Sequence, residues 1–196
     1  MATQLAAYPS AATHFSRRLY EQQATQALRQ QIMGNYLDLP MDQLVFGKQD
    51  NGKPFLKNNV RVEFNQSHCN DQFVLAINQQ GLALGVDIET KHRKINIQAL
   101  AARILTPLEQ KQFVLSDRPQ EFLLKIWTVK EAVLKASGLG IRLNLHTLET
   151  GARCDGHGMA AQPLIGHWHY KCFETSQHYY TIAWQDIVAA VDFVQI

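Results

Sequence analysis

The stretch from Pro119 to Gly138 constrains the fold more than any other part of the sequence, because it carries the signals for both ends of a long helix. Proline fits the first turn of a helix, and glycine readily adopts the left-handed conformation that ends one. Between these ends, apolar residues recur at helical spacing, at Phe122, Ile126, Val129 and Val133. We therefore expect a helix over residues 119–137 whose apolar face packs against the core.

Three further helices are expected. Residues 13–37 show helical spacing, and Asp38-Leu39-Pro40 would end a helix there. The expected core face of this first helix consists of Phe15, Leu19, Ala24, Leu28, Ile32 and Tyr36. Another helix is expected from Ile97 to Leu105, and the capping box Thr106-Pro107-Leu108-Glu109 then starts one that ends near Leu115.

Alternating apolar and polar residues predict strands in two parts of the chain. In the first part they fall at residues 60–64, 73–77 and 82–89, as an antiparallel meander, and the segment 64–69 is read as a loop. In the second part they fall at residues 168–172 and 180–184. This order of elements predicts an α+β fold of two halves, residues 1–90 and 91–196.

The composition is ordinary for a folded protein, with 46% hydrophobic residues in a chain of 196, and a formal net charge of +2 gives no support for extensive nucleic-acid binding. Three widely separated cysteines, Cys69, Cys154 and Cys172, do not suggest a disulfide framework and favour a reducing compartment. The sequence shows no signal-peptide pattern and no apolar run near the ~18 residues that a membrane span needs. We therefore expect a cytoplasmic protein without a membrane partner.

Two carboxylates lie on one predicted strand, in Gly85-Val-Asp-Ile-Glu89. Because residues two apart on a strand point to the same face, Asp87 and Glu89 project together while Val86 and Ile88 face the core. Two such carboxylates repel each other unless a positive charge sits between them, and a hard divalent cation is a natural occupant. The alternative is a pair of solvated acids at the end of a strand.

The helix over residues 119–137 offers a third carboxylate. Trp127, Glu131 and Lys135 stand four residues apart on one face of it. One interpretation makes Glu131 a metal ligand, with Lys130 and Lys135 available to phosphate. The other is a surface Glu131–Lys135 pair, which would contribute about 0.3–0.5 kcal/mol.

Two earlier segments hold candidate anion contacts. Ser67 and His68, read as loop residues, could donate hydrogen bonds to an anion, although loop serine and histidine often only shape a turn. Lys53, in a Gly-Lys-Pro turn, has the same two interpretations. Cys69 is treated as a packing residue, because neighbours on an extended chain point apart and Cys69 and His68 would make a poor catalytic pair.

Taken in order, these motifs resemble the Sfp-type 4'-phosphopantetheinyl transferases of the holo-carrier-protein synthase superfamily. The blocks are G-K-P, then F-N-x-S-H, then G-V-D-I-E, then W-T-V-K-E-A-x-x-K with G-x-G behind it, between Lys53 and Gly140. The resemblance implies transfer of the 4'-phosphopantetheine arm of coenzyme A to a serine of an apo acyl- or peptidyl-carrier protein, with Mg²⁺ as cofactor. It also implies a monomer of two similar α+β halves, with antiparallel sheets and the site in the cleft between them.

The resemblance also implies a role for each site residue. Asp87, Glu89 and Glu131 would bind Mg²⁺, and Lys135 would contact the transferring phosphate. Glu131 is also the candidate base for the carrier serine, directly or through a metal-held water. The remaining coenzyme A contacts would be Lys53, Ser67, His68, Lys130 and Arg29. Arg29 fits the family helix best, although this N-terminal region carries fewer basic residues than the family pattern.

Three alternatives remain beside this interpretation. A D-x-E pair with a distant glutamate also occurs in metal-dependent nucleases and phosphatases, whose substrate grooves are usually more basic. A zinc-binding module could use Cys154, His157, His167 and His169, although their spacing is irregular. A homologue that only binds coenzyme A is disfavoured because every motif carboxylate is present.

Overall fold

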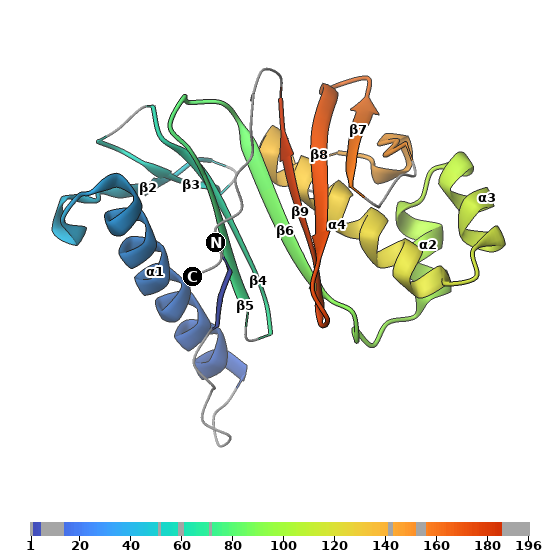
Figure 1. Ribbon diagram of the computed structural model, residues 1–196, viewed down its shortest axis with the longest axis horizontal. Helices are drawn as coiled ribbons and strands as arrows, with labels where there is room; N and C mark the ends of the chain where they lie inside the picture. The colour runs from blue at the N-terminus through green and yellow to red at the C-terminus, as the bar shows by residue number, and fades with distance from the viewer. Residues whose placement is uncertain are drawn as a thin grey trace.

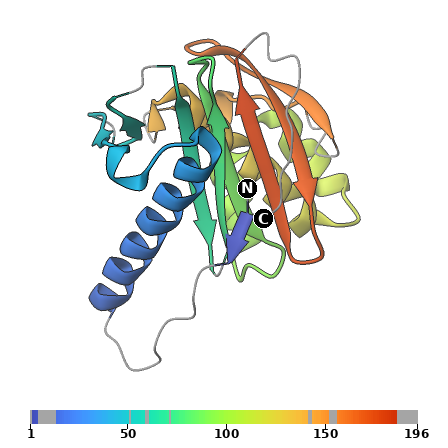
Figure 2. The same cartoon turned by 60° about the vertical axis from the view of Figure 1, so that its left-hand side comes forward.

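The computed structural model describes residues 2–4, 14–50, 52–58, 61–70, 72–140, 143–151 and 156–185. Helix α1 and helix α4 lie on opposite sides of the strands (Figures 1 and 2). The α-helices are α1 (His14–Leu37), α2 (Ile97–Ile104), α3 (Pro107–Leu115) and α4 (Pro119–Ser137), with 3-10 turns η1 (Met41–Gln43) and η3 (Leu145–Thr147). No helix in these ranges is both long enough and apolar enough to cross a membrane.

The strands form antiparallel pairs in three sheets. One sheet has the order β1-β5-β4, a small one pairs β2 with β3, and a third has the order β6-β9-β8-β7. Their bounds are β1 (Ala2–Gln4), β2 (Phe46–Lys48), β3 (Pro54–Leu56), β4 (Glu63–Cys69), β5 (Gln72–Asn78), β6 (Leu84–Thr90), β7 (His157–Gln162), β8 (Gly166–Glu174) and β9 (His178–Trp184). The predicted α+β class with antiparallel sheets is confirmed.

The helix ends follow the local signals in the sequence. α4 begins at Pro119 and ends before Gly138, whose φ is 70°. At the start of α3, the Thr106 hydroxyl accepts from the backbone N–H of Glu109, whose carboxylate accepts from the Thr106 N–H, so the capping box is confirmed.

The expected core face of α1 is wrong at its C-terminal end. Tyr36 is 49% exposed, and Met33 is buried instead. Each step of four residues in a helix with 3.6 residues per turn advances about 40° beyond a full turn. The run from Leu28 through Ile32 to Tyr36 therefore rotates off the face that packs on β4 and β5.

The expected loop at residues 64–69 is also wrong, because these residues form most of β4. The polar run has the composition of a loop, but its inward-facing members find hydrogen-bond partners in the neighbouring elements. Asn65 accepts a hydrogen bond from the backbone N–H of Val86 at 3.0 Å, and Ser67 is buried. His68 is exposed, because alternation turns it to the other face of β4. Ser67 and His68 therefore point to opposite sides of one sheet.

Strand β6 lies at the centre of the fold. It pairs with β9, with Asp87 opposite Thr181, so it belongs to the C-terminal sheet although a boundary at residue 90 assigns it to the first half. The division into two similar halves stays a prediction. Val86 and Ile88 pack with residues of β5 and β9, whereas Gly85 and Asp87 face α4. β6 is thus buried on both faces, with an apolar cluster on one and α4 on the other.

The close approach of α4 to β6 depends on Gly85. A Cβ at this position would lie 2.1 Å from the carbonyl oxygen of Ala132 and 2.5 Å from the backbone nitrogen of Ala136. Both atoms belong to the backbone of α4 and cannot rotate away. Any side chain here would have to push the helix off the sheet.

We expect Gly85→Ala to lower the free energy of unfolding by about 3 kcal/mol or more, at the upper end of overpacking effects. Gly52→Ala is the matched control: Gly52 has a φ of 83° but no atom within 4 Å of an added Cβ. There only the left-handed conformation is penalised, at about 1 kcal/mol. Urea unfolding of both variants measures the difference, and equal losses would show that the contact with α4 is loose.

Candidate active site

Asp87 lies between β4 and α4 and receives two hydrogen bonds on one oxygen. Its Oδ1 accepts from Lys135 Nζ at 2.7 Å and from Ser67 Oγ at 3.0 Å. Lys135 Nζ also donates to Ser67 Oγ at 2.7 Å and to the carbonyl of Val86 at 3.1 Å. The predicted surface pair of Lys135 with Glu131 is therefore wrong, since the lysine pairs with the buried Asp87 across the helix–sheet contact. The part of the chain that the structure describes offers Asp87 Oδ2 no hydrogen bond.

Glu89 is held by donors on both of its oxygens. Its Oε1 accepts from the backbone N–H of Thr90 at 3.0 Å and from Cys69 Sγ at 3.3 Å, and its Oε2 accepts from Arg93. Burial and the nearby Glu89 carboxylate raise the pKa of the Cys69 thiol to about 12, so the thiol stays protonated and donates. Glu89 is thus fixed in orientation before any ligand arrives.

Glu131 is a partly buried carboxylate near Asp87. Burial raises its pKa, the negative charge of Asp87 adds to this effect, and Lys135 and Arg93 oppose it. Glu131 receives no hydrogen bond from the residues that the structure describes. A partly buried carboxylate without donors can bind a cation or accept a proton.

The predicted Mg²⁺ ligands Asp87, Glu89 and Glu131 suit a hard cation in their donor chemistry. All supply carboxylate oxygens, and Asp87 Oδ2 and Glu131 have acceptor positions left open. In the arrangement observed, however, the described residues form no group of three or more His, Cys, Asp or Glu side chains placed as metal ligands. The positive charge at this site comes from Lys135 and Arg93, so the metal-ligand set stays a prediction.

A second polar group lies on the α1 side of β4. Arg29 of α1 is buried and stacks its guanidinium 4.2 Å from the centre of the Phe46 ring. It donates to Gln66 Oε1 at 3.4 Å, and alternation along β4 puts Gln66 and His68 on the same face. Burial lowers the pKa of Arg29, and its Nε has no hydrogen-bond partner among the described residues. Arg29 and His68 thus share one side of β4, while Ser67 joins the carboxylates on the other.

Lys53 directly precedes β3, and its side chain reaches the first residue of β4. Its Nζ pairs with Glu63 Oε2 at 3.2 Å, and Glu63 is the first residue of that strand. The structure gives it no contact with Asp87, Glu89 or Glu131 among the described residues. Its assignment to coenzyme A stays a prediction.

Lys130, which was also expected to contact phosphate, lies in a buried ion pair. Its side chain is fully buried, and Nζ lies 2.6 Å from Glu109 Oε2, 2.6 Å from the carbonyl of Ile104 and 2.8 Å from that of Leu145. Glu109 also accepts from the backbone N–H and the hydroxyl of Thr150. Lys130 therefore ties α4 to α2, α3 and η3 and points away from Asp87.

The histidines of the alternative zinc site belong to no group of three metal ligands among the described residues. Cys154 lies outside the described residues, and His157 and His167 are exposed. His169 stacks on Trp184 with ring centres 6.0 Å apart. No zinc-like group of three ligands is present in the described ranges, so the structure gives this alternative no support.

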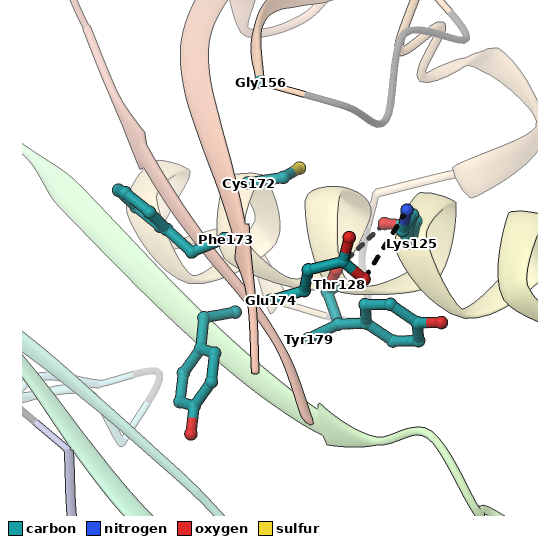
Figure 3. Close-up of a pocket in the computed structure, with 8 residues that line it drawn as sticks. Lys125, Thr128, Gly156, Cys172, Phe173, Glu174 and Tyr179 are labelled. Carbon is teal, nitrogen blue, oxygen red and sulfur yellow. Dashed lines mark hydrogen bonds and ion pairs between the residues drawn. The ribbon is translucent and has the colours of Figure 1, made fainter. Parts of the chain in front are cut away.

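A pocket of about 210 Å³ lies on the β8 side of α4 (Figure 3). Lys125 and Thr128 of α4, together with Cys172 and Glu174 of β8 and Tyr179 of β9, line it. Thr128 Oγ1 donates to the carbonyl of Lys125 at 2.9 Å. None of the predicted site residues lines this pocket, so it is separate from the carboxylate cluster.

Sequence reasoning missed two residues of the cluster, Arg93 and Cys69. Cys69 was treated as packing, but its strand position puts it on the same face as Ser67, toward Glu89. Strand alternation would have identified it, had the segment been read as a strand. Arg93 follows Glu89 by four residues in an irregular segment, where no sequence period predicts a contact.

Comparison with known proteins agrees with these motifs. The sequence model of the 4'-phosphopantetheinyl transferase superfamily matches residues 83–191, more than half of the chain. The chain is 30% identical over 144 residues to 4'-phosphopantetheinyl transferase psf-1 of Bacillus pumilus, covering 72% of this chain and 59% of that protein. It is 30% identical over 123 residues to 4'-phosphopantetheinyl transferase HetI of Nostoc sp., covering 60% and 52%. The chain thus spans little more than half the length of these curated relatives.

A solved structure is also similar over part of the chain. It is the holo-[acyl-carrier-protein] synthase of Thermotoga maritima, with a TM-score of 0.42 and 19% sequence identity. The similarity covers 54% of this chain and 64% of that one.

We expect Lys130→Met to lower the free energy of unfolding by about 3–5 kcal/mol, because it leaves the buried Glu109 charge uncompensated. The double variant with Glu109→Gln should recover part of that loss. Lys111→Met, an exposed lysine on α3, is the control and should change stability by less than about 0.5 kcal/mol. Chemical unfolding measures all three. A Lys130→Met protein of normal stability would show that the ion pair is not needed for folding, and Lys130 would again be a candidate phosphate contact.

Proposed function

This chain belongs to the 4'-phosphopantetheinyl transferase superfamily, and on that premise we propose that it is an enzyme that transfers the 4'-phosphopantetheine arm of coenzyme A to a serine of an apo carrier protein. The observation that carries the proposal is the cluster of Asp87, Glu89, Glu131 and Lys135 with Ser67, because it brings three family motifs into one site. The products would be a holo carrier protein and 3',5'-ADP.

The reaction needs charge stabilisation and positioning more than covalent chemistry. The serine oxygen forms a bond to the β-phosphorus of coenzyme A while the bond from that phosphorus to the bridging oxygen breaks. Negative charge grows on the phosphoryl oxygens and on the leaving nucleotide. The serine proton must go to a base.

Asp87, Glu89 and Glu131 would hold Mg²⁺. When bound, such an ion neutralises diphosphate charge during transfer. The open acceptor positions on Asp87 Oδ2 and on Glu131 support this assignment. The proximity of two of these carboxylates also supports it, since the negative charge of Asp87 helps to raise the pKa of Glu131 and a cation would offset that repulsion.

Lys135 would contact the transferring phosphate. Its ammonium is already placed by Asp87, Ser67 and the Val86 carbonyl, so little ordering is needed when substrate arrives. Ser67 would support it from β4, at the phosphate end of the substrate. Glu131 is partly buried and receives no hydrogen bond from the described part of the chain, and it is the candidate base for the serine proton.

The nucleotide end of coenzyme A would lie on the α1 side of β4. Arg29 and His68 share that side, and Arg29 Nε, which has no hydrogen-bond partner in the described ranges, could donate to an anion there. Lys53 pairs with Glu63 at the start of β4, and it would add a further positive charge for the nucleotide phosphates. Such a substrate would span β4, from the His68 face to the Ser67 face.

We also propose the partners, the location and the oligomeric state that the family suggests. The partners would be coenzyme A and a carrier protein, without nucleic acid or membrane, and the protein would act as a cytoplasmic monomer. The Cys69 thiol donates to Glu89, which suits a reducing compartment. A nuclease-like or phosphatase-like activity is the alternative, supported only by the D-x-E pair with a distant glutamate.

Release of 3',5'-ADP on mixing the protein with coenzyme A, Mg²⁺ and an apo carrier protein tests the proposal. We expect Asp87→Asn to reduce this release by several orders of magnitude, and a chelator to stop it in wild type. Asp117→Asn, at an exposed acid before α4, is the control and should keep full activity. Hydrolysis of coenzyme A without a carrier would favour the phosphatase alternative, and normal turnover in chelator would refute the metal assignment.

We expect Lys135→Ala to reduce kcat by orders of magnitude with little change in coenzyme A binding, because its charge is needed where phosphate charge develops. Lys135→Arg should recover only part of the rate, since its shape differs. Lys125→Ala is the matched control: it also removes an ion-paired lysine from α4, 2.9 Å from Glu121. Single-turnover transfer with saturating coenzyme A measures each variant, and a Lys135→Ala enzyme within twofold of wild type would leave the lysine a structural role only.

A further inference from the structure

The two carboxylates of β6 each have their own cation, contributed by a different part of the chain. Asp87 pairs with Lys135 from α4, and Glu89 pairs with Arg93 from the segment between β6 and α2. Glu131 receives no hydrogen bond from the described residues, although Lys135 and Arg93 both lower its pKa. Each carboxylate of β6 therefore has a positive partner, and Arg93 does for Glu89 what Lys135 does for Asp87.

The oxygens of Glu89 can be followed one by one. A carboxylate has about four acceptor positions, two on each oxygen. On Oε1, both are taken, by the Cys69 thiol at 3.3 Å and by the backbone N–H of Thr90 at 3.0 Å. On Oε2, Arg93 takes one. One position on Oε2 is left, so Glu89 can offer a cation a single oxygen without losing a donor.

Arg93 is itself held in place. Its guanidinium carbon lies 5.7 Å from the centre of the Trp127 ring, one helical turn before Glu131 on α4. Its backbone N–H donates to the carbonyl of Thr90 at 3.3 Å, and its own carbonyl accepts from Gln120 at 3.3 Å. Its side chain is 37% exposed, whereas that of Glu89 is 8% exposed. The aromatic ring and the two backbone hydrogen bonds hold this partly exposed arginine in one position, unlike the arginine of a mobile surface ion pair.

We propose that Arg93 is a positioning residue for the metal site. It holds Glu89 so that this ligand presents one oxygen, Oε2, in a fixed orientation, and the Trp127 ring holds the guanidinium that does so. The inference rests on the proposed function, because it takes Glu89 as a metal ligand. It assigns Arg93 a role in metal affinity, in addition to any effect on substrate.

Electrostatics alone predicts the opposite effect of removing Arg93. Loss of a positive charge beside three carboxylates should strengthen the binding of a divalent cation. Loss of a group that orients a metal ligand should weaken it, typically 10- to 100-fold. The direction of the change therefore separates a positioning role from a simple charge effect.

Binding of Mn²⁺ to the metal-free protein, followed by electron paramagnetic resonance without coenzyme A, gives a readout independent of activity. We expect Arg93→Gln to raise the Kd for Mn²⁺ about tenfold or more, and Arg93→Lys to recover part of that loss because an ammonium can still donate to Oε2. Arg118→Gln is the matched control: it removes one arginine that is 80% exposed and pairs with Glu121 at the start of α4. Its Kd should match wild type, and all variants should have the wild-type melting temperature in chelator.

The outcomes separate this inference from the proposed function. Wild-type binding that Asp87→Asn abolishes establishes the metal site. If Arg93→Gln then binds Mn²⁺ as well as wild type, or more tightly, the positioning role is wrong while the function stands. If wild type binds no Mn²⁺ at these carboxylates, the metal assignment and this inference fail together.

Discussion

The site depends on the close contact between α4 and β6 at Gly85. With no side chain there, the backbone of the helix lies directly on the strand, and an added Cβ would meet Ala132 at 2.1 Å. The carboxylates on β6 and the charged residues of α4 are thereby brought within hydrogen-bonding range of each other. β4 completes the arrangement from the other side, because Asn65 bonds the backbone of β6 and Ser67 bonds Asp87. One small residue therefore sets the distance across which the charges interact.

The helix α4 takes part in two charged networks of opposite character. In the Lys130–Glu109 ion pair both charges are satisfied: Glu109 and two carbonyls surround the ammonium, and Thr106 and Thr150 donate to the carboxylate. A network of this kind is fully compensated and rigid. Around Asp87 the compensation is incomplete, since no described residue donates a hydrogen bond to Glu131 and its pKa is raised. The first network fixes the helix in place, and the second leaves acceptor positions where a ligand can bind.

Much of this fold could be predicted from the sequence, because its signals are local. The capping box at Thr106 and the glycine after Ser137 act within a few residues, and both were predicted correctly. The polar strand β4 could not be predicted in the same way. Its Asn65 and Ser67 have partners 20 or more residues away, on β6, and a polar run without its partners has the composition of a loop. Arg93 was missed for a similar reason, because only the folded chain brings it between Glu89 and Trp127.

The sequence by itself determined that Asp87 and Glu89 share a face, because side-chain direction in a strand follows from its two-residue period. It also determined that Lys130 and Lys135 point apart on their helix, since five residues correspond to a rotation of about 140°. Only the tertiary structure decided which of the two lysines meets the carboxylates. Both have similar neighbours in sequence, but the face carrying Lys130 is covered by α2, α3 and η3, whereas that carrying Lys135 packs on β6. That choice depends on what covers each face of the helix, and the covering elements come from distant parts of the chain.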